Sequence, residues 1–457
     1  MAAHSQSFRW LAQFRPTYLR PSTTRRKTLM QTAVESAESL RQEVTPQARR
    51  HVIAILSIAL LARSLILWFA VVRFPHGWLY SRGIELGTLA QSLLRGHGLS
   101  SPFGGSTGPT ALLAPGYPVV IAILFRVFGS FTFTAAIAVM TLQLLFSLLT
   151  VFAIMLVARW CFGASAANIA GTFWALSLPI LWMPTIFWET CLSTLILVGL
   201  IALALRSERN PRSSLWVLMG AYCGLAVLVN PALLLALLAI LGWAAWQTRK
   251  TCRYAPLFGL VVFLLVFLPW PIRNARVLHA FIPLRSTVGF ELWIGNRPGA
   301  TGFLDESQFP LFNRREYNDY VSRGEVVYMQ DKSDLAKSYI RAHPLEFVRL
   351  TAVRFVRFWA GTGSKDGSAI FAIHALLTTS LGIIGIWRLV RKRRLSLAVL
   401  FILPLILFPL PYYVTHAEFR YRLVLDPLLT ILSAYTVSEL ITYSRKRLRE
   451  PVVSKHS

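Results

Sequence analysis

The sequence is poor in charged residues, and acidic residues are the scarcer kind. Only 15% of its 457 residues are charged, with 20 Asp or Glu against 47 Lys or Arg, whereas about a quarter of a soluble domain is charged. Hydrophobic residues make up 55% of the chain, and the mean hydropathy is +0.53. These values exclude an ordinary soluble globular domain and favour a chain that crosses a lipid bilayer several times.

Several patterns that mark known chemistry are absent. The chain has four cysteines without a Cys-x-x-Cys pair, so neither a disulfide framework nor a zinc site is expected. It has no Walker loop, dinucleotide fingerprint, His-Glu-x-x-His or Ser-His-Asp pattern, which leaves an ATP-driven pump and a metalloprotease without support. The absence of a repeat of about 20–50 residues argues against a solenoid and, more weakly, against a transporter built from inverted repeats.

Long apolar runs are the dominant feature of the chain. Most have roughly the 17–25 residues that cross about 30 Å of hydrocarbon as a helix, and they lack the in-out alternation of barrel strands. They lie near residues 51–72, 113–128, 132–158, 164–182, 186–205, 214–230, 231–247, 254–271, 369–390, 395–413 and 422–443. The sequence therefore predicts an all-α membrane protein with about 10–11 transmembrane helices.

The polar segments divide the predicted chain into parts. The parts are a basic disordered cytoplasmic tail (1–50), an N-terminal transmembrane module (51–271) that includes an amphipathic outer loop (74–112), a large extracytoplasmic loop (272–368), a C-terminal transmembrane module (369–445) and a basic tail (446–457). The net charge of +27 is carried mainly beside and between apolar runs. Positive-inside topology and anionic lipid headgroups explain that placement, so no nucleic-acid partner is expected.

Charge also predicts which segments lie outside. The basic N-terminal tail and the basic residues 249–253 and 391–394 should be cytoplasmic, which places 74–112 and 272–368 on the outer side. An even number of crossings must then separate the two outer segments, but seven apolar runs lie between them. One run must fail to cross: either 113–128 is irregular, or the pair within 214–247 is.

The first outer loop contains a single acid, Glu85. After it, Leu86, Leu89, Leu93 and Leu94 recur at helical spacing, which predicts an amphipathic helix with its apolar face in lipid. A carboxylate at the start of a helix is also favoured by the helix dipole alone, without any catalytic role. The Gly- and Pro-rich sequel, residues 96–118, nevertheless has the composition of a built site rather than a simple connection.

Several motifs then follow in a recognisable order. The acid precedes Gly96-His97-Gly98 and a Pro115-Gly116-Tyr117-Pro118 entry to the next run. Phe128-Gly129 and Phe162-Gly163 each lie beside a basic residue, and the last span is preceded by the stretch His416 to Arg422. This order resembles the C-type membrane glycosyltransferases, especially relatives of the protein O-mannosyltransferases and lipid A aminoarabinose transferases. The architecture is similar over roughly residues 50–445, and the motifs cover about a fifth of that.

The resemblance implies an enzyme that uses a polyprenyl-phosphate sugar. In that family an acid of the first outer loop works at the acceptor, and Glu85 is the matching position, although Ile84 precedes it where many relatives carry a second acid. Arg420, Tyr421 and Arg422 are expected to hold the donor phosphate. Snorkelling and aromatic anchoring at the interface would explain the same triplet without a ligand.

Weaker candidates complete the predicted site. Contacts to the acceptor or the sugar are assigned to His97, Glu189, Asn296, His416 and Glu418. Arg63, midway along the first apolar run, is expected to need a buried partner, for which Glu189 is one choice. The sequence assigns no cofactor and leaves a divalent metal open.

The resulting hypothesis is a plasma (inner) membrane enzyme with its site on the extracytoplasmic face. It would transfer a sugar from a polyprenyl-phosphate donor to a lipid, glycan or protein acceptor, with inversion at the anomeric carbon as the family implies, and membrane lipids would be its other partners. A transporter or flippase of lipid-linked saccharides and a non-catalytic membrane scaffold remain as alternatives.

Overall fold

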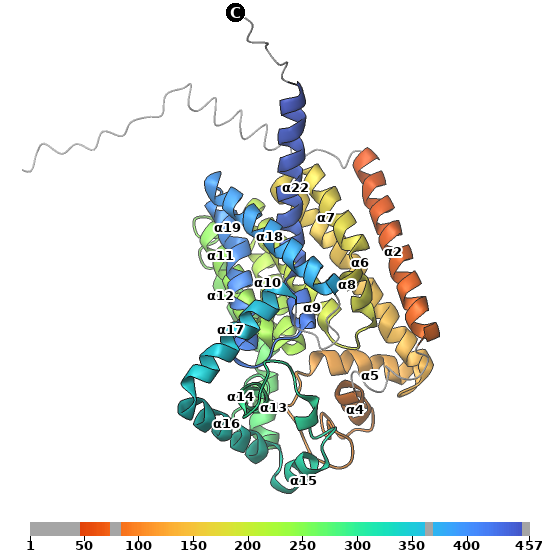
Figure 1. The fold of residues 1–457 in the computed structure, drawn as a ribbon, viewed down its shortest axis with the longest axis vertical. Helices are drawn as coiled ribbons and strands as arrows, with labels where there is room; N and C mark the ends of the chain where they lie inside the picture. Colours follow the sequence, from red (N-terminus) through yellow and green to blue (C-terminus); the bar gives the residue numbers. More distant parts are fainter. Residues whose placement is uncertain (1–45, 74–83, 362–368, 450–457) are drawn as a thin grey trace, which may run out of the picture. The chain divides into compact units, whose positions relative to one another are not determined.

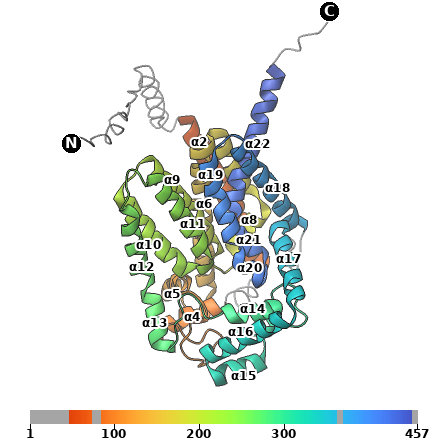
Figure 2. The same cartoon turned by 90° about the vertical axis from the view of Figure 1, so that its left-hand side faces the viewer.

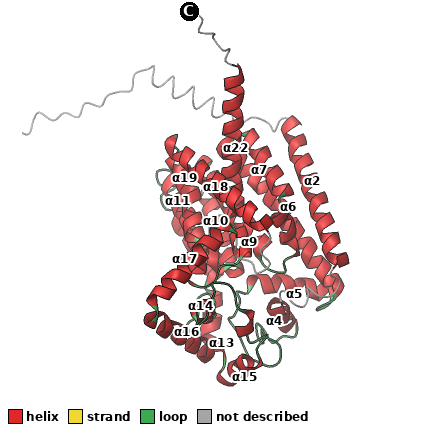
Figure 3. Ribbon diagram, viewed as in Figure 1, coloured by secondary structure: helices red, strands yellow, loops and turns green. Residues whose placement is uncertain are grey.

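The computed structural model describes residues 46–73, 84–361 and 369–449, where helices joined by loops, with one isolated β-bridge between Ser100 and Pro109, make up the structure (Figure 3). The predicted tails 1–50 and 446–457 therefore lie mostly outside the described residues. The described residues from 52 onward belong to one compact unit. This unit contains every predicted site residue.

The helices follow one another in the order of the predicted runs, with short helices between them (Figure 1). They are α2 (Pro46–Arg73), α4 (Ile84–Leu94), α5 (Gly116–Phe128), α6 (Phe133–Phe162), α7 (Ala164–Leu176), α8 (Leu178–Trp182), η1 (Met183–Thr185), α9 (Thr190–Arg209), α10 (Ser213–Val229), η2 (Pro231–Leu233), α11 (Leu234–Thr248), α12 (Ala255–Phe267), α13 (Pro269–Leu278), α14 (Val288–Asn296), η3 (Glu306–Gln308), α15 (Arg314–Arg323), α16 (Glu325–Ala342), α17 (Pro344–Ala360), α18 (Ala369–Arg391), α19 (Leu395–Leu407), α20 (Leu410–Val414), α21 (Phe419–Leu423) and α22 (Asp426–Arg449).

Seven helical segments in the described ranges are long and apolar enough to cross a membrane, or eight if the bent pair α7–α8 is one span. The protein is therefore a multi-pass membrane protein, as its composition predicted. Helix α5, with 13 residues, is too short to qualify and runs crosswise to the long helices in Figure 1. Helix α10 (17 residues), part of the other suspect pair, is also too short by the same criterion, so length alone does not choose between the two suspects, whereas the crosswise course of α5 favours the run 113–128.

The bend between α7 and α8 is stabilised by a buried arginine. The two helices differ in direction by 58°, and the end of α7 leaves carbonyl groups without helical partners. Arg63 of α2 donates to two of them, Trp174 O at 3.0 Å and Ala175 O at 3.2 Å, and also to Ser147 Oγ at 2.8 Å. Hydrocarbon offers no water to these carbonyl groups, so they need a donor within the protein. Arg63 supplies it, and its partner is therefore the broken helix and not Glu189.

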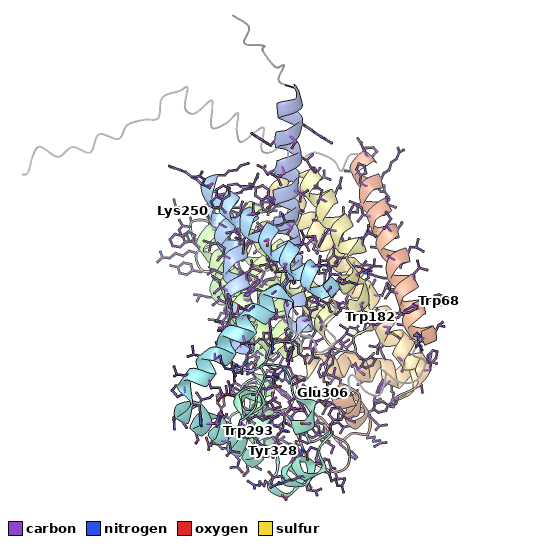
Figure 4. The ribbon with its side chains drawn as sticks, viewed as in Figure 1. Trp68, Trp182, Lys250, Trp293, Glu306 and Tyr328 are labelled. Carbon is purple, nitrogen blue, oxygen red and sulfur yellow. The ribbon has the colours of Figure 1, made fainter. Side chains whose placement is uncertain are left out.

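Two hydrophobic cores are present. The larger one joins α6, α7, α9, α10, α11, α19 and α22. The second one lies at the end of the long helices where α4 and α5 are found, and it joins them to α14, α15 and α16. In Figure 4, Lys250 marks the opposite, basic end of the helices, and Tyr328 marks the second core. Leu86 and Leu89 of α4 are 2% and 0% exposed in that core, so the expectation that this face of α4 lies in lipid is wrong.

A buried carboxylate fixes the Gly- and Pro-rich loop to the second core. Glu325, the first residue of α16, accepts hydrogen bonds from Thr110 Oγ1, from Ala111 N at 2.7 Å and from Tyr320 Oη at 2.7 Å. Burial and the neighbouring Glu325 raise the pKa of Tyr320, so its hydroxyl stays a donor. Arg273 binds the same loop through Thr110 O at 2.7 Å and Leu99 O at 2.8 Å.

Candidate active site

Glu85 stands at the start of α4, in the first turn of the helix. Its side chain is half-buried, and burial raises the pKa of the carboxyl above its ordinary value. The charges of Arg420 and Arg285 act in the opposite direction, and that of Glu291 adds to the rise. Residues from two other parts of the sequence, 285–291 and Arg420, therefore lie within electrostatic reach of this carboxyl group.

Arg420 and Tyr421 reach this region from the short helix α21, which Figure 2 shows between the long helices and α14. The Arg420 guanidinium binds Glu418 at 2.5 Å, donates to Tyr421 Oη at 3.2 Å and lies 4.5 Å from the centre of the Trp188 ring. Burial opposes the charge on Arg420, but Glu418 and Glu189 favour it, and the pKa of Arg420 stays above its ordinary value. The guanidinium is therefore a permanent cation.

A small recess, partly open to solvent, lies beside these residues. Its walls come from α4, from the loop and start of α5, from the start of α9 and from η2. They are lined by Leu86, Leu113, Ala114, Tyr117, Pro118, Glu189, Val229, Pro231 and Arg285. The two charged groups, Glu189 and Arg285, stand among mainly apolar and aromatic side chains, which is the usual composition of a small-molecule site.

Arg285 is a site residue that the sequence did not single out. Its Nε donates to Leu112 O at 2.8 Å, which fixes the side chain to the loop before α5. No further hydrogen bond from its guanidinium to a described residue is found, so its remaining N–H groups are available to a ligand. In the sequence Arg285 is one of many basic residues in a long polar segment, and no motif distinguishes it.

His416 and Glu418 also belong to this cluster. His416 is buried, with its Nε2 at 2.9 Å from Tyr421 Oη and its Nδ1 at 3.3 Å from a carboxylate oxygen of Glu291. The ring of Tyr421 stacks on Tyr412, with 4.2 Å between the ring centroids. These contacts orient the phenol of Tyr421 and place an aromatic surface beside Arg420.

Arg422 lies apart from the site, although it is only two residues from Arg420. Its side chain is 0% exposed and bonded to Asp426 inside the helix bundle. A five-residue helix turns successive side chains by about 100°, so neighbours cannot all face one ligand. The predicted phosphate contact therefore fits Arg420 and Tyr421 but not Arg422.

Asn296 and His97 are also outside the cluster. The side-chain amide of Asn296 donates to Val414 O and Leu292 O, both at 2.8 Å, and its oxygen accepts from Arg354 at 3.0 Å. These bonds join α14 to α20 and leave the Asn296 side chain no obvious capacity for a sugar. His97 is exposed in the turn after α4. Neither position supports the contact predicted for it.

Within the described ranges, no group of three or more His, Cys, Asp or Glu side chains is arranged to hold a metal ion. The divalent metal that the sequence left open therefore has no candidate ligand set in this part of the chain. The charged groups that do converge are two arginines, several carboxylates and one histidine.

Comparison with known proteins relates part of the chain to a family. Residues 113–272 match the model of the dolichyl-phosphate-mannose-protein mannosyltransferases. The resemblance to C-type membrane glycosyltransferases is thereby confirmed. The matched region begins at the pocket wall formed by Leu113 and Ala114 and includes Glu189. No curated protein matches the whole sequence significantly.

Solved structures show the same fold. The oligosaccharyltransferase of Archaeoglobus fulgidus, in complex with Zn and sulfate, matches with a TM-score of 0.53 and 15% identity over 87% of this chain and 50% of its own. The AglB oligosaccharyltransferase of that organism, bound to an inhibitory peptide and a dolichol-phosphate, matches with a TM-score of 0.51 and 14% identity over 89% and 52%. The chain thus spans about half the length of these proteins.

Proposed function

We propose that the protein transfers a sugar from a polyprenyl-phosphate donor to an acceptor at the pocket beside Glu85. The observation that carries this proposal is that the charges of Arg285 and Arg420 both act on the Glu85 carboxyl, beside a pocket that Leu86 and Arg285 line, in a chain whose residues 113–272 match the mannosyltransferase family model. A carboxylate and two permanent cations are the groups that an acceptor hydroxyl and a phosphate leaving group require. The bound dolichol-phosphate of the archaeal oligosaccharyltransferase supports a lipid phosphate as the donor carrier.

The proposed reaction is a single displacement. The acceptor oxygen attacks the anomeric carbon as the bond from that carbon to the phosphate oxygen breaks, and the electron pair of the broken bond stays on the phosphate. Glu85 takes the proton of the acceptor, which its raised pKa favours. Arg420 and Arg285 stabilise the negative charge that develops on the leaving phosphate, and the anomeric configuration inverts.

The proposal extends to topology. Counting α10 and α22 as spans gives ten crossings: α2, α6, α7–α8, α9, α10, η2–α11, α12–α13, α18, α19–α20 and α22. Six of these separate α4 from α14, which satisfies the required even number. The arginines 249, 253, 391, 393 and 394 then fall on the cytoplasmic side, and the pocket falls on the extracytoplasmic face of the plasma (inner) membrane.

The test uses the full chain in proteoliposomes with a radiolabelled polyprenyl-phosphate sugar. We expect release of polyprenyl phosphate and transfer of the sugar to an added lipid, glycan or peptide acceptor. Glu85→Gln should lower kcat by about 10²–10⁴-fold, the usual contribution of a general base. Glu306→Gln, at an exposed acid of the segment 272–368, is the matched control and should retain activity.

Two outcomes would contradict the proposal. If wild-type protein moves the labelled lipid between leaflets without cleaving it, the protein is a transporter or flippase. If wild-type protein cleaves the donor and Glu85→Gln does so at the same rate, the enzyme stands but Glu85 is not its base.

A further inference from the structure

A second charged cluster lies inside the helix bundle, next to the site but closed to it. Asp426, the first residue of α22, is 0% exposed and accepts from Arg422 and from His374 Nε2, the latter at 3.0 Å. His374 Nδ1 lies 2.8 Å from Ser177 Oγ. Sequence inspection found no Ser-His-Asp pattern, yet the fold brings Ser177, His374 and Asp426 into one chain of hydrogen bonds.

The remaining bonds of Arg422 close the cluster against α18. Its second terminal nitrogen donates to Thr378 Oγ1 at 2.7 Å, to Thr379 Oγ1 at 3.0 Å and to Ala375 O at 3.0 Å. A consistent direction for the chain of bonds has His374 Nε2 donate to Asp426 and Nδ1 accept from Ser177. Arg422 Nη2 shares its two N–H groups among three acceptors, and Arg422 Nε has no hydrogen-bond partner. The positive charge of Arg422 then balances the negative charge of Asp426.

The cluster connects the two segments that carry the site. Ser177 lies at the break between α7 and α8, and the chain from there leads through η1 to Trp188 and Glu189. Arg422 lies on α21, the helix that presents Arg420 and Tyr421. Arg420 stands 4.5 Å from the Trp188 ring, so the two segments meet at the site as well.

Stability alone does not account for such a cluster. Taking an ion pair out of water costs several kcal/mol per ion, and well-packed apolar residues of similar volume are often as stable or more stable. Buried polar groups are instead suited to fixing one arrangement among several, because each bond has a required geometry.

We propose that Ser177, His374, Asp426 and Arg422 form a positioning network that holds α21 and the 177–189 segment together, so that Arg420 faces the donor phosphate in the pocket. The proposal rests on the function proposed above. None of the four residues touches the substrate, and the network acts through Arg420.

The test replaces the ion pair by apolar residues in the full-length protein. Arg422→Met with Asp426→Leu removes both charges and keeps most of the volume, so the fold should persist with a similar Tm. We expect the KM for the donor to rise about ten-fold or more while kcat changes less, because Arg420 loses its orientation. Arg422→Lys, which keeps the charge but cannot make all of the bonds, should give an intermediate KM.

A matched control separates positioning from general damage. Trp243→Phe removes a buried hydrogen bond to Ser396 O, of 2.8 Å, between α11 and α19. That variant should lower Tm without a comparable change in KM. If the double variant keeps its Tm and also keeps its KM, the network does not position Arg420 and the proposal is wrong.

Amide hydrogen exchange gives a readout that needs no donor. In the double variant, residues 177–190 and 416–425 should exchange faster than in wild type, with little change elsewhere. If the wild type does not cleave the donor but the double variant still exchanges faster in these two segments, the proposed enzyme function is wrong and the network remains supported. Unchanged exchange in both segments would refute the network, whatever the activity.

Discussion

Arg420 and Arg422 are two residues apart on one short helix, yet their surroundings differ. Arg422 is buried and bonded to Asp426, Thr378, Thr379 and Ala375 O. Arg420 is half-buried beside a solvent-open pocket, where Glu189 accepts no hydrogen bond from another described side chain. Among the groups described, Arg422 and Asp426 are paired with each other inside the closed cluster, although Arg422 Nε has no hydrogen-bond partner, whereas the open site leaves charge available. On the function proposed above, the same residue types serve structure in one place and binding in the other.

This contrast has an energetic meaning. A buried charge cluster must satisfy its members because an unpaired charge in hydrocarbon costs several kcal/mol. A ligand site can leave groups unsatisfied where water reaches them, and the ligand later replaces that water. Four predictions test whether the two clusters differ in this way, in order of decreasing effect.

The largest effect is expected from breaking the closed cluster on one side only. Asp426→Ala leaves Arg422 as a buried charge without its carboxylate, which should cost about 3–5 kcal/mol of folding stability. Asp305→Ala is the matched control, since Asp305 pairs with Arg297 at a partly exposed position and should cost less than about 1 kcal/mol. Thermal unfolding in detergent measures the stability of both variants. Equal losses of folding stability in the two variants would contradict the claim that the closed cluster depends on its buried ion pair.

The next effect concerns the cations of the open site. Arg420→Met and Arg285→Met should each raise the KM for the donor about 10- to 100-fold, because a hydrogen bond to a charged group contributes about 1.5–3 kcal/mol. Stability should fall little, since neither residue satisfies a buried carboxylate alone. Steady-state kinetics with a polyprenyl-phosphate sugar measure this, with exposed Arg315→Met as control. An unchanged KM in Arg285→Met would remove Arg285 from the site.

The third prediction concerns pH. Burial raises the pKa of Glu85, and a general base must be ionised, so kcat/KM should fall as pH is lowered through that raised pKa. Arg285 favours the ionised carboxylate, and Arg285→Met should therefore move the acid limb of the profile to higher pH. Rate–pH profiles of the two proteins measure the shift; a shift to lower pH would contradict the assignment.

The smallest effect marks the edge of the site. His97 is exposed and lies outside the charged cluster, so His97→Ala should change kcat and KM by no more than about two-fold. His416→Ala, inside the cluster and 2.9 Å from Tyr421, should change them more. Steady-state kinetics of the His97→Ala and His416→Ala variants measure the difference. A larger loss of kcat/KM in the His97 variant would place the site nearer the glycine-rich turn.

The sequence predicted the parts of the fold that depend on hydrophobicity and charge. Runs long enough to span, basic ends and polar loops are local properties, so they can be read without a structure. The parity argument also named residues 113–128 as one of two suspects for a single irregular run, and the crosswise course of α5 favours it. What could not be read was whether the apolar face of α4 meets lipid or a second protein core.

The candidate site was predicted less completely, for a physical reason. Glu85 and Arg420 stand out because each lies in a motif, but Arg285 becomes a neighbour only when the chain after α13 folds back onto Leu112. Arg422 was grouped with Arg420 because the sequence shows spacing and not direction. The structure separates them, since Asp426 binds Arg422 one helical turn away.

The central claim is that Glu85 and Arg420 act in one site, Glu85 on the acceptor and Arg420 on the donor phosphate, close enough for each to affect the other's interaction with the donor. Its most direct test is the affinity for polyprenyl phosphate alone, measured for wild type, Glu85→Gln, Arg420→Met and the double variant. We expect tighter binding in Glu85→Gln, which loses a carboxylate, and weaker binding in Arg420→Met. The change in binding free energy of the double variant should differ from the sum of the two single changes by about 0.5–3 kcal/mol. Strictly additive effects, with an unchanged Kd in Glu85→Gln, would show that the two residues serve separate places.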